Sequence, residues 1–171
     1  LVRIGIILVL LMPFVVKTDV FFPFITGKAL YARSLIEVIF VLWIVLAIRY
    51  SRYRPRCSWV TLALTLYVTI GFVAGLTGVS ITLSIWSNYE RMQGIFDMVH
   101  WLAFVVVLAA VVHNLPHWRT ILGLNLAISL AISVIGLAQN YGKTLLPYLW
   151  HLSDTGRVDA TLGNPTFMAA F

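Results

Sequence analysis

The chain has 171 residues, of which 61% are hydrophobic and only 11% are charged. Soluble domains usually carry about a quarter charged residues, so this composition excludes an ordinary soluble domain and indicates an integral membrane protein. The net charge of +6 comes from residues between apolar runs, where it reports membrane topology rather than nucleic-acid binding. The single cysteine, Cys57, excludes an internal disulfide and a cysteine-based zinc site.

The apolar runs predict one transmembrane domain over residues 1–171, built of α-helices. A helical span needs about 20 apolar residues, and these runs are too long and too continuous for the alternating strands of a membrane barrel. The first and last runs are cut short at the chain ends. We therefore expect an all-α polytopic bundle, truncated at both ends, with about five full spans and the start of a sixth. The spans are expected near 1–16, 31–48, 59–79, 96–112, 121–138 and from 165 onward.

The loop at 49–56 sets the predicted orientation, because it holds four arginines within eight residues. Such a cluster is typical of a cytoplasmic loop. Alternation of spans then places 113–119 on the cytoplasmic side, and 17–30, 80–95 and 140–164 on the outer side. This orientation leaves six cations outside, more than the rule expects, so we interpret them as kept for a function. They are Lys17, Lys28, Arg33, Arg91, Lys143 and Arg157.

Four of these cations, Lys28, Arg33, Arg91 and Arg157, lie next to predicted helix starts. A helix N-terminus offers unpaired N–H groups and a positive dipole end, and arginine adds a planar fork that fits phosphate oxygens. Convergence of such elements would make an anion site half in lipid, which a lipid-linked diphosphate fits. For any one of them, the simpler alternative is an interfacial side chain that reaches a lipid head group.

Two pairs of polar residues inside the predicted spans have structural interpretations. The four-residue spacing of Arg33 and Glu37 predicts an ion pair within one helix, which would shelter both charges in the membrane. Asp97 and His100 lie three apart on one helical face. They are either a proton-handling pair or, more simply, a hydrogen-bonded pair that packs helices together.

Asn164 and Pro165 predict a helix start, with asparagine as the cap and proline at the first helical position. Other motifs are missing from the sequence. No outer Asp-x-Asp or Glu-x-x-His pair is present to hold a divalent metal, and there is no Walker loop or dinucleotide fingerprint. No span carries the charge ladder of a voltage sensor or proton pump. We therefore expect no metal, no cofactor and no nucleic-acid partner.

Three stretches carry a resemblance to a known family: FPFITGKALYARSLIEVIFVLW, SIWSNYERMQG and GRVDATLGNPTFMAAF. Together they resemble the N-terminal half of the O-antigen ligase and polymerase superfamily of bacterial membrane proteins. The third stretch is the most specific, with an arginine, a Gly-Asn-Pro turn and a helix start of small residues. The resemblance covers nearly the whole chain, through short motifs in apolar surroundings.

The resemblance implies a metal-independent glycosyltransferase of the bacterial inner membrane. Such proteins transfer a glycan from undecaprenyl diphosphate to lipid A core, a growing polysaccharide or a protein, on the outer face of the membrane. Arginines bind the diphosphate in this family, and Arg91 and Arg157 occupy the matching motifs, with Lys28 as a weaker third position. Arg33, at a span start, completes the candidate substrate-binding set. The resemblance places the catalytic base, a histidine, in an outer loop beyond residue 171.

Two other classes of function stay open from the sequence. A transporter or flippase for an anionic lipid or solute would also need outer cations, but is expected to show broken helices in two repeated halves. The chain shows no clear internal repeat. A membrane anchor without chemistry would leave the outer arginines without a role.

Overall fold

The computed structural model describes residues 1–20, 22–55, 58–88, 92–141 and 158–170. These residues form helices and short 3-10 turns, with no strand among them, which confirms the all-α prediction. The helices are α1 (Val2–Leu10), α2 (Thr26–Arg49), α3 (Trp59–Thr77), α4 (Ile81–Trp86), α5 (Ile95–Val111), α6 (Leu115–Asn140) and α7 (Pro165–Ala170). The turns are η1 (Met12–Phe14) and η2 (Ser51–Tyr53).

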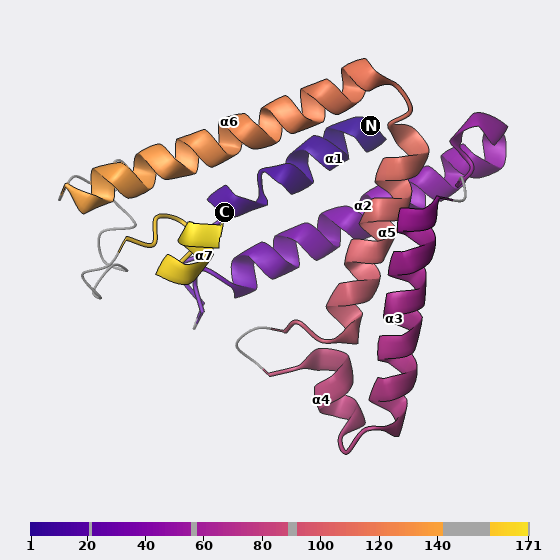
Figure 1. Cartoon of the computed structure of the whole chain (residues 1–171), viewed down its shortest axis with the longest axis horizontal. Helices are drawn as coiled ribbons and strands as arrows, with labels where there is room; N and C mark the ends of the chain where they lie inside the picture. Colours follow the sequence, from indigo (N-terminus) through magenta and orange to yellow (C-terminus); the bar gives the residue numbers. More distant parts are fainter. Residues whose placement is uncertain (21, 56–57, 89–91, 142–157, 171) are drawn as a thin grey trace.

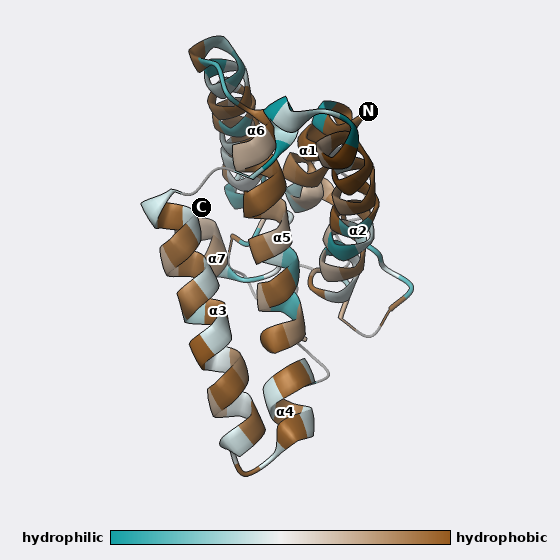
Figure 2. Cartoon of the chain, turned by 90° about the vertical axis from the view of Figure 1, so that its right-hand side faces the viewer, coloured by the Kyte–Doolittle hydropathy of each residue, from teal (hydrophilic) through white to brown (hydrophobic). Residues whose placement is uncertain are grey.

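Three of these helices, α2, α3 and α6, are long and apolar enough to cross a membrane, and α5 is a shorter apolar helix of 17 residues. Figure 2 shows apolar residues along most of α3 and α5. The expected span at 1–16 is wrong in its form: α1 ends after nine residues and η1 follows. Pro13 explains the break, because it has no N–H for the helical hydrogen bond and its ring crowds the preceding turn.

Several helix boundaries also differ from the prediction. α6 begins at Leu115 rather than near 121, because Pro116 lies in the first turn, where its missing N–H costs nothing. α2 begins at Thr26, five residues before the predicted start. The predicted outer loop at 80–95 contains α4, which begins after Ser80. The Ser80 hydroxyl caps that helix by accepting from Leu83 N at 3.4 Å.

The helices form two groups that cross steeply (Figure 1). α1, α2 and α6 run alongside one another, and α3 and α5 run alongside each other with α4 at their lower end. α1 is antiparallel to α2, and the Tyr31 hydroxyl of α2 donates to Leu8 O near the end of α1 at 2.9 Å. The first turn of α1 therefore lies with the last turns of α2 and α5.

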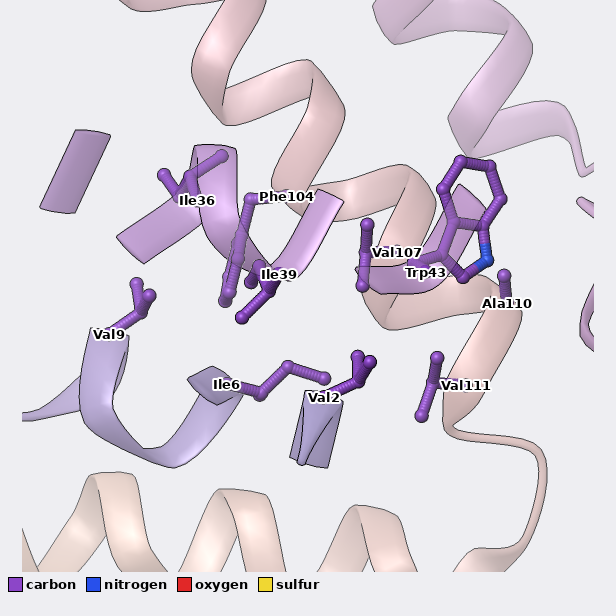
Figure 3. Packing of buried hydrophobic residues seen from close by; sticks show 10 residues of the cluster. All are labelled: Val2, Ile6, Val9, Ile36, Ile39, Trp43, Phe104, Val107, Ala110 and Val111. Carbon is purple, nitrogen blue, oxygen red and sulfur yellow. The ribbon is translucent and has the colours of Figure 1, made fainter. Parts of the chain in front are cut away.

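The main core lies where α1, α2 and α5 meet (Figure 3). Gly5 lets α1 approach α2 closely, since a Cβ atom there would lie 2.0 Å from Ile39 Cγ2. Small residues at such crossings allow the tight packing that holds helices together in lipid. The core residues are Val2, Ile6 and Val9 of α1, Ile36, Ile39 and Trp43 of α2, and Phe104, Val107, Ala110 and Val111 of α5.

A second, smaller cluster connects α6 with the segment before α7. Ile128 and Ile132 of α6 are buried with Ala160, and Leu10, Leu11 and Phe14 pack against them. The cluster holds residues 158–162 against α6, close to the N-terminal end of α2. This arrangement positions the candidate site.

Candidate functional site

A pocket of about 270 Å³ lies beside the N-terminal half of α2. It brings together the three stretches that carry the family resemblance. Lys28 and Arg33 come from the first stretch, Gln93 from the second, and Leu162 and Phe167 from the third. The rest of the lining is mainly apolar or aromatic, with two further polar groups from α5. These remaining lining residues are Met12, Phe24, Ile25, Ala29, Ala32, Ile36, Asp97, His100 and Trp101.

Lys28 is buried, with 8% of its surface exposed, and its ammonium group is held by backbone carbonyls. Nζ donates to Phe24 O at 3.0 Å and to Thr161 O at 2.6 Å, and it lies 5.6 Å from the centroid of the Phe24 ring. An ammonium group has three N–H donors, so one donor is left for another acceptor in the pocket. Lys28 thus joins the start of α2 to the segment before α7 and brings a positive charge to the pocket.

Arg33 is 4% exposed and binds the α5 carboxylate of Asp97. Its Nε and Nη2 atoms donate to Asp97 Oδ1 at 3.0 and 2.9 Å, and Nη2 also donates to Met92 O. Trp101 Nε1 donates to the other oxygen, Asp97 Oδ2, at 3.1 Å. The carboxylate is therefore shared between α2 and α5 and fixes the guanidinium.

The remaining guanidinium nitrogen of Arg33, Nη1, is buried and has no hydrogen-bond partner among the described residues. Leaving a charged donor without a partner in a buried place costs free energy. The rings of Trp86 and Phe96 lie beneath the guanidinium, with centroids 5.8 and 5.6 Å from Arg33 Cζ. Nη1 is therefore the guanidinium nitrogen of Arg33 that is left for a further acceptor, and Arg33 lines the pocket.

The predicted Arg33–Glu37 ion pair is wrong, as is the predicted pairing of Asp97 with His100. Arg33 pairs with Asp97, and Glu37 pairs with His100, whose Nε2 lies 3.0 Å from Glu37 Oε1. His100 Nδ1 contacts Phe96 O at 2.7 Å. Each pair joins α2 to α5. These pairs therefore hold two helices together, which a pair within one helix cannot do. Glu37 lies outside the pocket lining, with 62% of its side chain exposed.

Residues 158–163 form a buried wedge between α6 and the start of α2. The amide of Gln139 donates to Asp159 Oδ1 at 2.8 Å. Its Oε1 accepts from the backbone N of Asp159 and Ala160, at 3.2 and 2.8 Å. Thr161 is fully buried, and its carbonyl accepts from Lys28. The sequence reasoning missed Gln139 and Asp159, because no motif marks a residue whose partner is 20 positions away.

The helix start at Asn164 and Pro165 is confirmed. α7 begins at Pro165, and Asn164 Oδ1 accepts from Thr166 N at 2.8 Å, as an N-cap does. Gly163 precedes it with a φ of +71°, and a Cβ atom there would lie 2.3 Å from Phe24 Cγ. The Gly-Asn-Pro motif therefore combines a left-handed turn, a close contact and a cap at one edge of the pocket.

Arg91 and Arg157, the two arginines best matched by the resemblance, lie outside the described residues. Their neighbours on the described side are Met92, whose carbonyl accepts from Arg33, and Val158, at the beginning of the wedge. Among the residues that the structure describes, no group of three or more His, Cys, Asp or Glu side chains has the arrangement of a metal site.

Compared with known protein families, curated proteins and solved structures, the chain matches none of them. Its function is therefore inferred from its own residues.

Proposed function

We propose that this chain forms the donor-binding part of a membrane glycosyltransferase of the O-antigen ligase type. The enzyme would transfer a glycan from an undecaprenyl diphosphate carrier to a lipid A core, glycan or protein acceptor, on the outer face of a bacterial inner membrane. The observation that carries this proposal is the apolar pocket that holds two buried cations, Lys28 and Arg33, at the meeting point of the three resembling stretches.

The pocket has the chemistry that a lipid-linked diphosphate requires. Arg33 Nη1 has no partner among the described residues, and Lys28 has one N–H left after its two carbonyl bonds, so both can donate to phosphate oxygens. The apolar lining from Ala29, Ala32 and Ile36 suits the first isoprene units of the carrier. Asp97 holds the guanidinium in place. Its single negative charge leaves the group of Lys28, Arg33 and Asp97 with a net positive charge.

The proposed reaction needs charge stabilisation at the leaving group. The acceptor hydroxyl oxygen forms a bond to the anomeric carbon of the donor sugar, while the bond from that carbon to the diphosphate oxygen breaks and leaves undecaprenyl diphosphate. A base takes the hydroxyl proton. Fixed guanidinium and ammonium groups in a poorly hydrated pocket stabilise the negative charge that develops on the diphosphate. Lys28 and Arg33, with Arg91 and Arg157 as further candidates, supply this part of the reaction.

The test uses the full-length protein in proteoliposomes, with a purified undecaprenyl diphosphate-linked glycan and its acceptor. Arg33→Lys keeps the charge but loses the guanidinium fork, and we expect transfer to fall about a hundredfold or more. Arg157→Ala and Arg157→Lys should do the same. Arg119→Lys, an exposed substitution at the other end of the helices, is the matched control and should transfer normally.

Binding of undecaprenyl diphosphate alone separates recognition from chemistry. Arg33→Lys should also weaken this binding, and size-exclusion behaviour and melting temperature report how far loss of the contacts to Asp97 and Met92 lowers stability. Near-normal transfer by both Arg33→Lys and Arg157→Ala would overturn the proposal. Translocation of the carrier without glycan transfer would assign the pocket to a flippase instead.

A further inference from the structure

A second pocket, of about 390 Å³, lies at the opposite end of α2. Lys28 and Arg49 are 21 residues apart on this helix, so the two pockets are separated by about 30 Å along its axis. The first turn of α1, the last turns of α2 and the turn η2 surround the second pocket. Two arginines, Arg3 and Arg49, and two tyrosines, Tyr50 and Tyr53, supply its polar groups.

Positive charge at this end has no compensating acid nearby in the described part of the chain. The two ion pairs among the described residues are Arg33–Asp97 and His100–Glu37, so neither Arg3 nor Arg49 belongs to an ion pair. Glu37, the acid closest to Arg49 along α2, is twelve residues away, or about 18 Å. Arg52, Arg54 and Arg119 are exposed and belong to the same end of the molecule. The pocket therefore has a positive potential.

Both arginines are oriented by neutral groups. Arg3 Nη1 donates to His117 Nε2 at 2.9 Å. Because a guanidinium only donates, Nε2 must accept, which makes His117 neutral. Arg49 Cζ lies 6.0 Å from the centroid of the Tyr50 ring. Most of the ten N–H donors of the two guanidinium groups are thus left to bind another acceptor.

The remaining wall of the pocket is apolar and open to the outer surface of α2. Leu42, Val45 and Leu46 line it, and Val45 is 60% exposed. The same face of the helix continues through Val41 and Val38, which are 60% and 57% exposed. An anion bound by the arginines would therefore have an apolar strip leading away from it along the membrane-facing side of α2.

We propose that this pocket binds an anionic glycerophospholipid, with its phosphate between Arg3 and Arg49 and an acyl chain along Leu42, Val45 and Val41. A soluble phosphate would satisfy the arginines but would leave the apolar strip unused, so the geometry favours the lipid. Trp43 Nε1 donates to the backbone carbonyl of Tyr53 at 3.0 Å, which holds the turn η2 against α2 at the edge of this pocket. The four-arginine loop predicts that this end is cytoplasmic, where anionic lipids carry the negative surface charge. The inference does not depend on the glycosyltransferase proposal.

The test measures lipid binding to the full-length protein by native mass spectrometry, with phosphatidylglycerol and phosphatidylcholine as the lipids. We expect one phosphatidylglycerol to be retained at least tenfold more tightly than phosphatidylcholine. Arg49→Gln removes no hydrogen bond that the structure describes, and should weaken phosphatidylglycerol binding about fivefold. Arg3→Gln combined with Arg49→Gln should weaken it about 25-fold.

The matched control is Arg52→Gln combined with Arg119→Gln, which removes the same charge from the same end but leaves the pocket lining intact. It should change binding less than twofold. Equal losses in the pocket and control variants would mean that the lipid only follows the overall charge, and would overturn the proposal. Unchanged binding by Arg49→Gln would overturn it too. Displacement of the lipid by millimolar inorganic phosphate or glycerol 3-phosphate would assign the pocket to a soluble anion.

Discussion

Two ion pairs join α2 to α5 through single residues. Arg33 and Glu37 have the spacing of an intrahelical pair, yet Arg33 binds Asp97 and Glu37 binds His100. The i to i+4 rule reports which residues can meet on one helix. It says nothing of a second helix that offers a better partner. The sequence thus identified the four residues as paired polar groups in predicted spans, but assigned them the wrong partners.

A double-mutant cycle distinguishes the two pairings. Asp97→Asn leaves a buried guanidinium without its carboxylate, and removal of one member of a buried pair typically costs about 3–5 kcal/mol. We expect a coupling energy between Arg33 and Asp97 of about 1–3 kcal/mol and one between Arg33 and Glu37 close to zero. Denaturant titration of the purified variants in detergent measures both. A larger coupling for Arg33 and Glu37 would contradict the interhelical pairs.

His100 carries a further constraint at the scale of single atoms. Its Nδ1 atom contacts a backbone carbonyl, which only accepts, so Nδ1 holds a hydrogen. Nε2 faces Glu37 Oε1, and a hydrogen bond there requires a second proton between them. Glu37→Gln preserves this hydrogen bond with a neutral histidine, because the side-chain amide can donate to Nε2.

At the scale of elements, the wedge at 158–163 depends on a glycine that no other residue replaces without strain. Gly163 has a φ of +71°, and an added Cβ atom would overlap the ring of Phe24. Gly163→Ala should destabilise the protein by about 1–3 kcal/mol and expose the wedge to protease. Gly123→Ala is the matched control. A Cβ atom there meets no other atom within 4 Å, so it should be neutral or stabilising by up to about 1 kcal/mol.

Limited proteolysis with mass spectrometry and thermal unfolding together check this prediction. Loss of stability in Gly123→Ala but not in Gly163→Ala would show that the turn is not held as the structure describes.

The start of α7 was predictable because Asn164 and Pro165 act on their own backbone. The position of the wedge could not be predicted from the sequence, because it depends on hydrogen bonds from Gln139 of α6 and Lys28 of α2.

At the scale of the whole molecule, the helix ends sort into two sides. The start of α1, the ends of α2 and α5 and the start of α6 gather at the arginine-rich end, and the first pocket lies toward the other. The orientation of these ends in a membrane stays a prediction of the four-arginine loop. Reporter fusions at Ser51 and His117 should read cytoplasmic, and fusions at Thr18 and Asn164 should read external. The reverse result at all four positions would place the first pocket on the cytoplasmic side and remove the basis for an outer-face enzyme.

The sequence predicted the helical class, the runs that became α2, α3, α5 and α6, and a convergence of outer cations near helix starts. Lys28 and Arg33 do line one pocket, whereas Arg91 and Arg157 lie outside the described residues. A long apolar run in one stretch of sequence is enough to predict a membrane helix, so these helices could be predicted without knowledge of the fold. The walls of the pocket could not be predicted in this way, because Met12, Gln93 and Phe167 belong to no motif and only the fold brings them together.

α6 is secured near its two ends, by Arg3 with His117 at one and by Gln139 with Asp159 and Ala160 at the other. Its 26 residues make a rod of about 39 Å, longer than the hydrocarbon layer of about 30 Å. Only 17% of its most apolar window is buried. In a membrane, contact with lipid would therefore largely set the tilt of this helix. The contacts of Gln139 continue along the chain to Thr161, whose carbonyl accepts from Lys28. We therefore predict that bilayer thickness, through the tilt of α6, alters the anion binding proposed for the first pocket, and binding measured in bilayers of different acyl-chain length tests this.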